Sequence, residues 1–361
     1  MQNVNQDVLK ISPYLPGKPI EELERERGIV DAVKLASNEN PRGPSDAVRQ
    51  AIRDATDYLS RYPDGSAYRL RGLIAERLEV SPDQLTFGNG SDEVLKIAGR
   101  AVLSPGDKGL VDEHCFIVYP ITILGCNAEP IRVASNGWSH DLQAIADAID
   151  ERTRIVYLAN PNNPTGTWFS HIEFVNFMAR VPDDVWVVLD EAYHEYACTQ
   201  LTYPDGVELL ESYSNLIVTR TFSKVYGLAA LRVGYAVSSP EIAELMNRVR
   251  QPFNVNSIAL AAAEAALRDD SYINESIELN IAGMATISQG LTELGLNCMP
   301  SIGNFITFEV GERAGDIYDA MLNRGVVVRP IANYDMPDHL RVTVGLPDEN
   351  ERFLNALEAS M

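Results

Sequence analysis

The stretch "TRTFSKVYGLAALRVGYAV", residues 219–237, places a lysine between two apolar runs that have the composition of buried strands. An ammonium at such a position loses hydration, which lowers the pKa of Lys224 toward the range in which a neutral amine attacks a carbonyl group. Thr221, Ser223 and Arg232 add hydroxyl donors and a fixed cation, which suit a phosphate beside that amine. A surface lysine whose stem lies on apolar neighbours is the alternative interpretation.

The composition and charge of the chain narrow its class. It has 361 residues, of which 45% are hydrophobic and 22% charged, and this length favours two lobes over one core. The formal net charge of -21 disfavours binding to nucleic acids and to acidic membrane surfaces. The sequence shows neither a secretion signal near its start nor an apolar run of about 20 residues, so we expect a soluble cytoplasmic protein.

The cysteines predict neither a disulfide nor a metal site. Their spacing is not paired, and no histidines stand near them in the order of a zinc site. We therefore expect buried free thiols and no metal. These cysteines are Cys115, Cys126, Cys198 and Cys298.

Short runs rich in Val, Ile and Leu alternate with helical patterns through the first two thirds of the chain. Strands this apolar are buried on both faces, so the alternation predicts an α/β fold with a mainly parallel sheet covered by helices. The predicted strands lie within residues 84–90, 108–113, 128–134, 154–161, 185–193, 215–223 and 232–239.

We expect an N-terminal arm, a large domain and a small domain. The arm, residues 1–36, contains a charged helix at residues 20–29 and has no core of its own. The large domain, residues 37–250, carries the predicted sheet. The small domain, residues 251–361, begins with an Ala-rich helix and continues as an α+β unit, so we expect a cleft between the two domains.

Polar residues follow the predicted strands at the edge where an open α/β sheet binds ligands. In "GNGSDE", residues 88–93, a Gly-rich turn opens a helix with Ser91 or Asp92 at the N-cap. Free N–H groups after Gly90 suit a phosphate, although an ordinary capped helix has the same pattern. A dinucleotide-dependent oxidoreductase is excluded because the third glycine of its fingerprint is missing.

Two further strand ends carry an amide and a carboxylate. In "ANPNNPTGTW", residues 159–168, Asn163 is a candidate donor to a ligand oxygen, and a rigid turn is the alternative. "VWVVLDEAYHEY", residues 185–196, ends a buried strand in Asp190, whose carboxylate requires Arg, Lys or a protonated ligand nitrogen as its partner. Tyr193 can present its phenol to the same ligand. An N-cap role for Asp190 is the alternative.

In order and spacing, "NPNNPTG", "LDEAY" and "TFSKVYGLAALRVGY" resemble the fold-type I aminotransferases that use pyridoxal 5′-phosphate. The resemblance runs nearly end to end, and "PYLPGKP", "KLASNENPRGP", "RYPDGSAYRLR", "GNGSDE", "GVVVRP" and "HLRVTVG" are similar to the histidinol-phosphate aminotransferase branch. It implies an aspartate aminotransferase-like large domain with a seven-stranded sheet. It also implies transfer of an amino group from histidinol phosphate to 2-oxoglutarate, in histidine biosynthesis.

The resemblance implies a role for each candidate around the cofactor. Lys224 is implied to form a Schiff base with the cofactor and to move the proton between substrate Cα and cofactor C4′, while Asp190 pairs with the ring nitrogen. Asn163 and Tyr193 are implied to hydrogen-bond the phenolic oxygen of the ring. Phe116 of "HCFIVY", otherwise an ordinary core residue, is implied to stack on the ring. The implied phosphate contacts are Gly90, Ser91, Asp92, Thr221, Ser223 and Arg232.

The resemblance further implies a homodimer with shared active sites. Tyr62, otherwise an ordinary turn residue, is implied to reach the phosphate of the neighbouring subunit, and Tyr14 to contact substrate from the neighbour's arm. Arg329 and Arg341 are implied to bind the phosphate of histidinol phosphate and the carboxylates of glutamate. Asn38 is implied to be a further substrate contact.

Two segments depart from the pattern of this branch. His114 and Cys115 stand where a proline or a small residue is expected, and Asn333 and Asp335 stand where glycines are common. A carboxylate near the arginine pair weakens phosphate binding, which makes an aromatic amino acid such as phenylalanine or tyrosine an alternative donor. A threonine-phosphate decarboxylase and a cofactor-binding sensor without catalysis are further alternatives. The acidic charge and the lack of a helix-turn-helix segment near the start disfavour the sensor.

Overall fold

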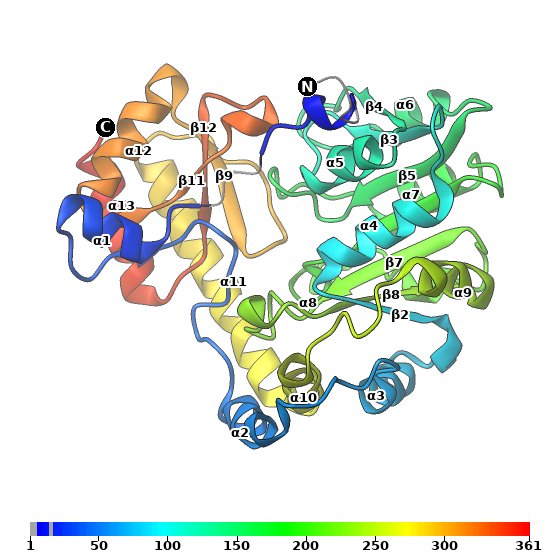
Figure 1. The fold of residues 1–361 in the computed structure, drawn as a ribbon. Coiled ribbons are helices and arrows are strands. Elements are labelled where there is room, and N and C mark those ends of the chain that lie inside the picture. The colour runs from blue at the N-terminus through cyan, green and yellow to red at the C-terminus, as the bar shows by residue number, and fades with distance from the viewer. Residues whose placement is uncertain (1–5, 14–16) are drawn as a thin grey trace.

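The computed structural model describes residues 6–13 and 17–361, which form helices around a seven-stranded and a three-stranded sheet (Figure 1). The strands are β1 (Val33–Lys34), β2 (Leu85–Gly88), β3 (Lys108–Asp112), β4 (Glu129–Val133), β5 (Thr153–Ala159), β6 (Trp186–Asp190), β7 (Leu216–Thr221), β8 (Gly234–Ser238), β9 (Phe305–Glu309), β10 (Val326–Val327), β11 (Arg329–Pro330) and β12 (His339–Thr343). The helices are α1 (Ile20–Arg27), α2 (Asp46–Ala55), α3 (Tyr68–Leu78), α4 (Ser91–Val102), α5 (Val118–Gly125), α6 (Leu142–Asp147), α7 (His171–Met178), α8 (His194–Ala197), α9 (Pro240–Val249), α10 (Ser257–Ala266), α11 (Asp270–Glu293), α12 (Ala314–Leu322) and α13 (Pro347–Glu358). Within the described part of the chain, no helix combines the length and apolar character needed to cross a membrane.

The large sheet has the strand order β2-β8-β7-β6-β5-β3-β4. Strand β8 runs antiparallel to both of its neighbours, and the remaining pairs are parallel. Each predicted apolar run forms one of these strands, so the prediction of a mainly parallel sheet is confirmed. The central strands are apolar throughout because both faces are covered: Val187 and Leu189 of β6 join one core, and Val188 joins the other.

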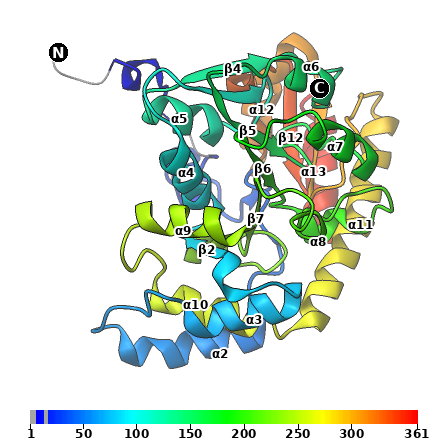
Figure 2. The ribbon, with the colours of Figure 1, turned by 90° about the vertical axis from the view of Figure 1, so that its right-hand side faces the viewer.

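Helices form a layer on each face of the large sheet (Figures 1 and 2). Helices α4, α5 and α9 bury their apolar side chains in the core that contains Val188. Helices α6 and α7, and the group α2, α3 and α10, contribute to the core that contains Val187. Helix α10 begins the predicted small domain but packs with this group through Ala259 and Ala263. The domain boundary after residue 250 stays a prediction.

The C-terminal part of the chain is built on the antiparallel sheet β11-β12-β9, which packs against α11, α12 and α13. The predicted arm shares a core with this part. Leu23 of α1 is fully buried and clusters with Leu322 and Val327, and β1 pairs in parallel with β10. The charged helix of the arm is therefore held by an apolar contact on its inner face.

The cysteines are all free thiols, but they differ in exposure. Cys115 is buried, Cys126 and Cys298 are half-buried, and Cys198 is exposed. The expectation of buried thiols is therefore wrong for Cys198, which lies directly after the short helix α8.

Gly234 begins β8 and lies against the start of α4. A Cβ at this position would meet the backbone nitrogen of Ser91, and it would lie 2.8 Å from the carbonyl carbon of Gly90 and 3.0 Å from the carbonyl oxygen of Arg220. All of these are backbone atoms, which cannot rotate away as a side chain can. We predict that Gly234→Ala lowers the free energy of unfolding by about 1–3 kcal/mol, measured by urea denaturation followed by circular dichroism.

Gly125→Ala is the matched control, because a Cβ at Gly125 would have no heavy atom within 4 Å. This variant should keep or slightly raise the stability of the protein. An equal loss of stability in both variants would show that the close approach of β8 to α4 is not the cause.

Candidate active site

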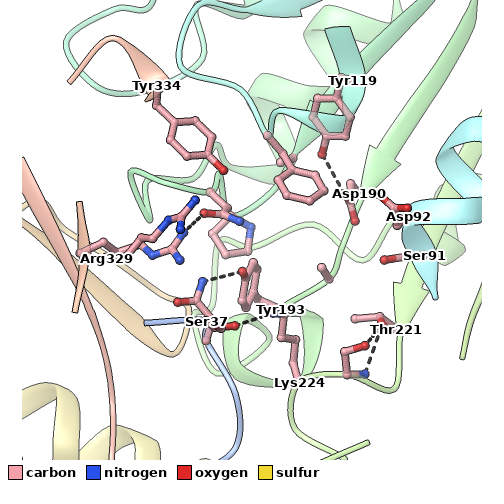
Figure 3. Close-up of a pocket in the computed structure, with 18 of the residues that line it drawn as sticks. Ser37, Ser91, Asp92, Tyr119, Asp190, Tyr193, Thr221, Lys224, Arg329 and Tyr334 are labelled. Atoms are coloured by element: carbon pink, nitrogen blue, oxygen red, sulfur yellow. Dashed lines mark hydrogen bonds between the residues drawn. The ribbon is translucent and has the colours of Figure 1, made fainter. Parts of the chain in front are cut away.

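One pocket gathers the strand ends of the large sheet and two arginines of the small sheet (Figure 3). Ala159, Asp190 and Thr221 end β5, β6 and β7, while Arg329 and Arg341 come from β11 and β12. The carboxyl ends of parallel strands share one edge of a sheet, so polar residues far apart in the sequence meet there. The predicted site residues that line this pocket are Asn38, Ser91, Asp92, Phe116, Asn163, Asp190, Tyr193, Thr221, Ser223, Lys224, Arg232, Arg329 and Arg341.

Gly90, Tyr62 and Tyr14 are not among the lining residues. Gly90 has a φ of +83°, and a Cβ there would lie 3.0 Å from Cζ of Arg232, so the absence of a side chain lets the guanidinium approach the start of α4. Tyr62 is 82% exposed and stacks on Phe253 with 4.7 Å between the ring centroids. Tyr14 lies outside the described residues.

Lys224 projects into the pocket from the turn after β7 (Figure 3). Its Nζ donates to the carbonyl oxygen of Ser37 at 3.4 Å and lies 5.4 Å from the centre of the Tyr193 ring. Burial is the main cause that lowers the pKa of Lys224 to about 8, and the positive charges of Arg341 and Arg232 contribute. Roughly a tenth of this amine is therefore neutral at pH 7 and able to attack a carbonyl.

Asp190 is a buried carboxylate whose side-chain partners are hydroxyl groups. Tyr119 Oη donates to Oδ2 at 2.8 Å, and Thr219 Oγ1 donates to Oδ1 at 3.0 Å. Burial raises the pKa of Asp190, while these two hydrogen bonds and the charge of Lys224 act in the opposite direction. No side chain in residues 6–13 or 17–361 forms an ion pair with it.

This environment decides between the alternatives for Asp190. An N-cap role is wrong, because α8 begins after Tyr193 and has no side-chain cap. An Arg or Lys partner is not found among the described residues, although a buried carboxylate requires a positive partner. The arrangement therefore suits a protonated nitrogen of a ligand that lies in the pocket.

The start of α4 differs from its prediction. The N-cap is Gly90 rather than Ser91 or Asp92, and no side chain caps the helix. Asp92 forms an ion pair with Lys96 at 2.6 Å instead. The first N–H groups of α4 are thus not used by a capping side chain, and together with Arg232 they suit a phosphate.

The hydroxyl groups beside Lys224 lie at this same end of the pocket. Thr221 Oγ1 donates to Ser223 Oγ at 3.0 Å, and Arg232 Nη1 donates to the same oxygen at 3.4 Å. Arg232 also donates to the carbonyl oxygen of Ala229 at 3.2 Å, which fixes its direction. The structure therefore brings the predicted cation and both hydroxyls together.

Arg329 and Arg341 are directly opposite each other in the antiparallel pair β11 and β12. Residues in this relation point to the same face of a sheet, so both guanidinium groups reach one side of the pocket. Arg341 Nη2 donates to the carbonyl oxygen of Ala36 at 3.0 Å, and its Nη1 donates to Asn163 Oδ1. Arg341 therefore links the small sheet to the turn after β5.

Asn38 connects two predicted contacts. Its Nδ2 donates to Tyr193 Oη at 2.8 Å, and Thr343 Oγ1 donates to its Oδ1 at 3.2 Å. The phenol of Tyr193 is thus held from the segment after β1 and, through Asn38, from β12.

Asp335 does not join the arginine pair. Its side chain is 77% exposed and lies 3.7 Å from Arg132, on the outside of the pocket. The expectation that its carboxylate weakens an anion site is therefore wrong. The residue has a φ of 60°, which explains why glycine suits this position.

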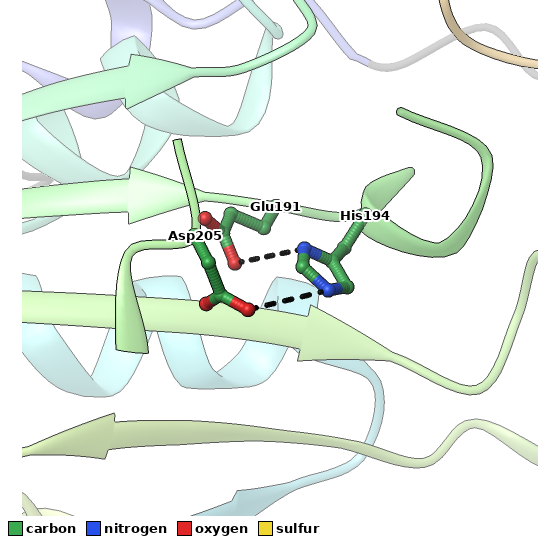
Figure 4. A group of neighbouring side chains, drawn as sticks. All are labelled: Glu191, His194 and Asp205. Atoms are coloured by element: carbon green, nitrogen blue, oxygen red, sulfur yellow. Dashed lines mark ion pairs between the residues drawn. The ribbon is translucent and has the colours of Figure 1, made fainter. Parts of the chain in front are cut away.

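A charged cluster lies directly after Asp190 in the chain (Figure 4). A carboxylate oxygen of Glu191, a ring nitrogen of His194 and a carboxylate oxygen of Asp205 all lie within 4.8 Å of one another, which is the spacing of a possible metal site. Arg220 donates to Glu191 at 2.8 and 2.9 Å and to Asp205 at 2.6 Å, which supplies the positive charge that the two carboxylates need. Burial lowers the pKa of His194 to about 3, so its ring is neutral. The cluster ties the segment after β6 to β7 and so fixes Asp190.

The pocket also contains residues that the sequence did not single out. Tyr119 lies one helical turn after Phe116, a spacing that marks it as a neighbour of the predicted stacking ring. Tyr334 lies within "RPIANYDMP", between the two arginines in the sequence. Ser37 contributes a backbone carbonyl, for which a sequence carries no signal.

Comparisons with known proteins find one family along most of the chain. A model of the family "Aminotransferase class I and II" matches residues 30–357. Histidinol-phosphate aminotransferase 2 of Pseudomonas fluorescens strain Pf-5 is 55% identical over 352 residues, which are 97% of this chain and 95% of that protein. The protein of the same name from Pseudomonas aeruginosa is 54% identical, with 97% of this chain and 95% of that protein covered.

Solved structures show the same fold. Histidinol-phosphate aminotransferase from Sinorhizobium meliloti, in complex with pyridoxal-5′-phosphate, superposes with a TM-score of 0.91 and 29% identity, covering 100% of this chain and 98% of that one. Aspartate aminotransferase from Thermus thermophilus superposes with a TM-score of 0.83 and 22% identity, covering 99% and 100% of the two chains, which shows the fold. The predicted aspartate aminotransferase-like fold is therefore confirmed.

The lowered pKa of Lys224 can be measured directly. We predict that, after reductive ¹³C-methylation, the Lys224 methyl signal titrates with a midpoint near 8, because burial and the nearby arginines disfavour its charged form. A midpoint of the Lys224 signal near the usual lysine value of about 10.4 in the NMR titration would contradict the electrostatic account of the pocket.

Proposed function

The chain belongs to the class I and II aminotransferases, and we propose that it transfers the amino group of histidinol phosphate to 2-oxoglutarate with pyridoxal phosphate as cofactor. The relatives that carry the name histidinol-phosphate aminotransferase match almost the whole chain at up to 55% identity in Pseudomonas. The observation that carries the proposal is the composition of the pocket. It combines a lysine of lowered pKa and a buried carboxylate with two sites suited to anions, which are the start of α4 beside Arg232 and the pair Arg329 and Arg341.

The residues of the pocket fit pyridoxal phosphate at three points. The carboxylate of Asp190 accepts from Tyr119 and Thr219 and suits a protonated ring nitrogen as its cation. The uncapped start of α4, with Arg232 beside it, suits the phosphate group. Lys224 supplies the amine that an aldehyde requires.

When bound, pyridoxal phosphate supplies an aldehyde that condenses with amines and a ring that accepts an electron pair from the substrate. Asp190 holds the proton on the ring nitrogen, which keeps the ring electron-poor. Lys224 takes the proton from the Cα of the amino donor and returns a proton to C4′ of the cofactor, a role suited to an amine with a pKa near 8. The same lysine serves the second half-reaction in reverse, with 2-oxoglutarate as the acceptor.

Other residues orient the cofactor and the substrates. Asn163, Tyr193 and Phe116 line the pocket. In the proposed function, the first two hydrogen-bond the phenolic oxygen of the ring and Phe116 packs on its face. The pair Arg329 and Arg341 binds the phosphate of the donor in one half-reaction and the carboxylate of the acceptor in the other. The alternative of an aromatic amino acid as the main donor depended on a carboxylate near the arginine pair. The carboxylate of Asp335 lies outside the pocket, so this support for the alternative is lost.

We further propose a homodimer in which Tyr62 and Tyr14 serve the active site of the partner subunit. Three large apolar side chains near Tyr62 are exposed. Tyr58 and Leu59, which precede it in the sequence, are 71% and 57% exposed, and Phe253, which stacks on its ring, is 46% exposed. Apolar surface of this kind favours burial at an interface. The cytoplasmic location stays a prediction.

The first test of the proposed function removes the amine. We predict that Lys224→Ala abolishes transamination between histidinol phosphate and 2-oxoglutarate and abolishes the mass adduct formed with pyridoxal phosphate after borohydride reduction. Circular dichroism should show an intact fold. Lys10→Ala, a change at an exposed lysine, is the control and should keep both properties. Normal turnover by the Lys224 variant would overturn the site assignment.

The second test concerns the arginine pair. We predict that Arg341→Ala raises KM for both histidinol phosphate and 2-oxoglutarate by about 10-fold or more, because each substrate loses a charge-assisted hydrogen bond. Arg313→Ala is the control, since Arg313 bonds the C-terminal carbonyl of Met361 at the surface. Unchanged KM values for both substrates would exclude Arg341 from substrate binding.

A further inference from the structure

Tyr334 forms part of the pocket wall beside the arginine pair. It is 4% exposed and lies at the end of the 3-10 turn Ala332–Tyr334, between β11 and β12. It belongs to an apolar cluster with Met336, and Ile117, which follows the predicted stacking residue Phe116, packs against this cluster. Figure 3 shows its hydroxyl group directed into the pocket, which Arg329 and Arg341 also line.

His114 holds the backbone of this wall through a direct hydrogen bond from its ring. Its Nδ1 lies 2.8 Å from the carbonyl oxygen of Tyr334, and because a carbonyl only accepts, Nδ1 carries the proton and donates. The His114 ring packs against the Trp138 ring with 5.3 Å between the centroids. The Trp138 ring packs in turn against that of His339 in β12, with 5.0 Å between the centroids. His114 is 8% exposed, so water does not compete strongly for this bond.

The position of His114 is itself fixed. Its backbone N–H donates to Asp112 Oδ1 at 2.8 Å, and its carbonyl oxygen accepts from Asn162 Nδ2 at 3.1 Å. Asp112 ends β3, and Asn162 belongs to the turn after β5. Hydrogen bonds of His114 therefore connect the end of β3 and the turn after β5 to the backbone of Tyr334 in the C-terminal part.

We infer that Tyr334 is a specificity-determining residue that favours a phosphorylated amino donor, and that His114 is its positioning residue. The inference rests on the proposed function and deepens it. A carboxylate offers two oxygens, which the forks of Arg329 and Arg341 can satisfy. A phosphate monoester offers three terminal oxygens, so a neutral hydroxyl donor beside the two guanidiniums adds a bond that only the phosphate uses fully.

The first arm of the test compares substrates in one variant. Tyr334→Phe should raise KM for histidinol phosphate about tenfold, the effect of one lost charge-assisted hydrogen bond, and should change KM for 2-oxoglutarate by less than about twofold. Tyr213→Phe, a change at a half-buried tyrosine outside the pocket, should change neither value. Equal effects on both substrates, or no effect on either, would overturn the inference.

The second arm tests the positioning role of His114. His114→Phe keeps a ring against Trp138 but removes the donor, and should reproduce the selective rise in KM for histidinol phosphate. His114→Asn restores an N–H donor and should recover most of the wild-type value. A loss of structure would instead lower the melting temperature and affect both substrates alike, which would overturn the positioning role.

The outcomes separate this inference from the proposed function. If the wild-type enzyme transaminates histidinol phosphate and Tyr334→Phe does so with an unchanged KM, the inference alone fails. If the wild-type holoenzyme does not transaminate histidinol phosphate, the proposed donor is wrong and the inference fails with it.

Discussion

The carboxylate of Asp190, buried at the end of a central strand, is the constraint on which the rest of the site depends. Its side-chain hydrogen bonds come from Tyr119 and Thr219, which are neutral donors. Neutral donors stabilise a buried carboxylate only in part, as the raised pKa of Asp190 shows. Under the proposed function, Asp190 would gain a cationic partner in the ring nitrogen of the cofactor, so cofactor binding would also stabilise this charge.

The topology of the large sheet brings Asp190 and the other site residues to one edge. The parallel strands β5, β6 and β7 end at one edge of the sheet, where Asp190 ends β6 and the turns after β5 and β7 carry Asn163 and Lys224. The small sheet closes the pocket with a pair of arginines in direct register. A chain with a net charge of -21 thereby concentrates positive charge where an anionic cofactor and anionic substrates meet.

The strand ends could be predicted from the sequence because a polar residue that terminates a long apolar run is costly to bury unless a partner or a ligand satisfies it. The exact N-cap of α4 could not, since Gly90, Ser91 and Asp92 are all compatible with a helix start and only the backbone geometry selects one. Tyr119 was missed because an aromatic residue in an apolar helix is normally a core residue, and its role arises only from Asp190 on another element. The side chain of Asp335 is 77% exposed and its φ is 60°, and neither property could be predicted from the sequence.

The most direct test of this account is the protonation state of the cofactor ring nitrogen in the assembled enzyme. It can be read from the ¹⁵N chemical shift of ring-labelled pyridoxal phosphate, at a pH above the pKa of the free pyridinium. The account predicts a protonated nitrogen in the wild-type protein and an unprotonated one in Asp190→Ala. An unprotonated nitrogen in the wild-type protein would contradict it.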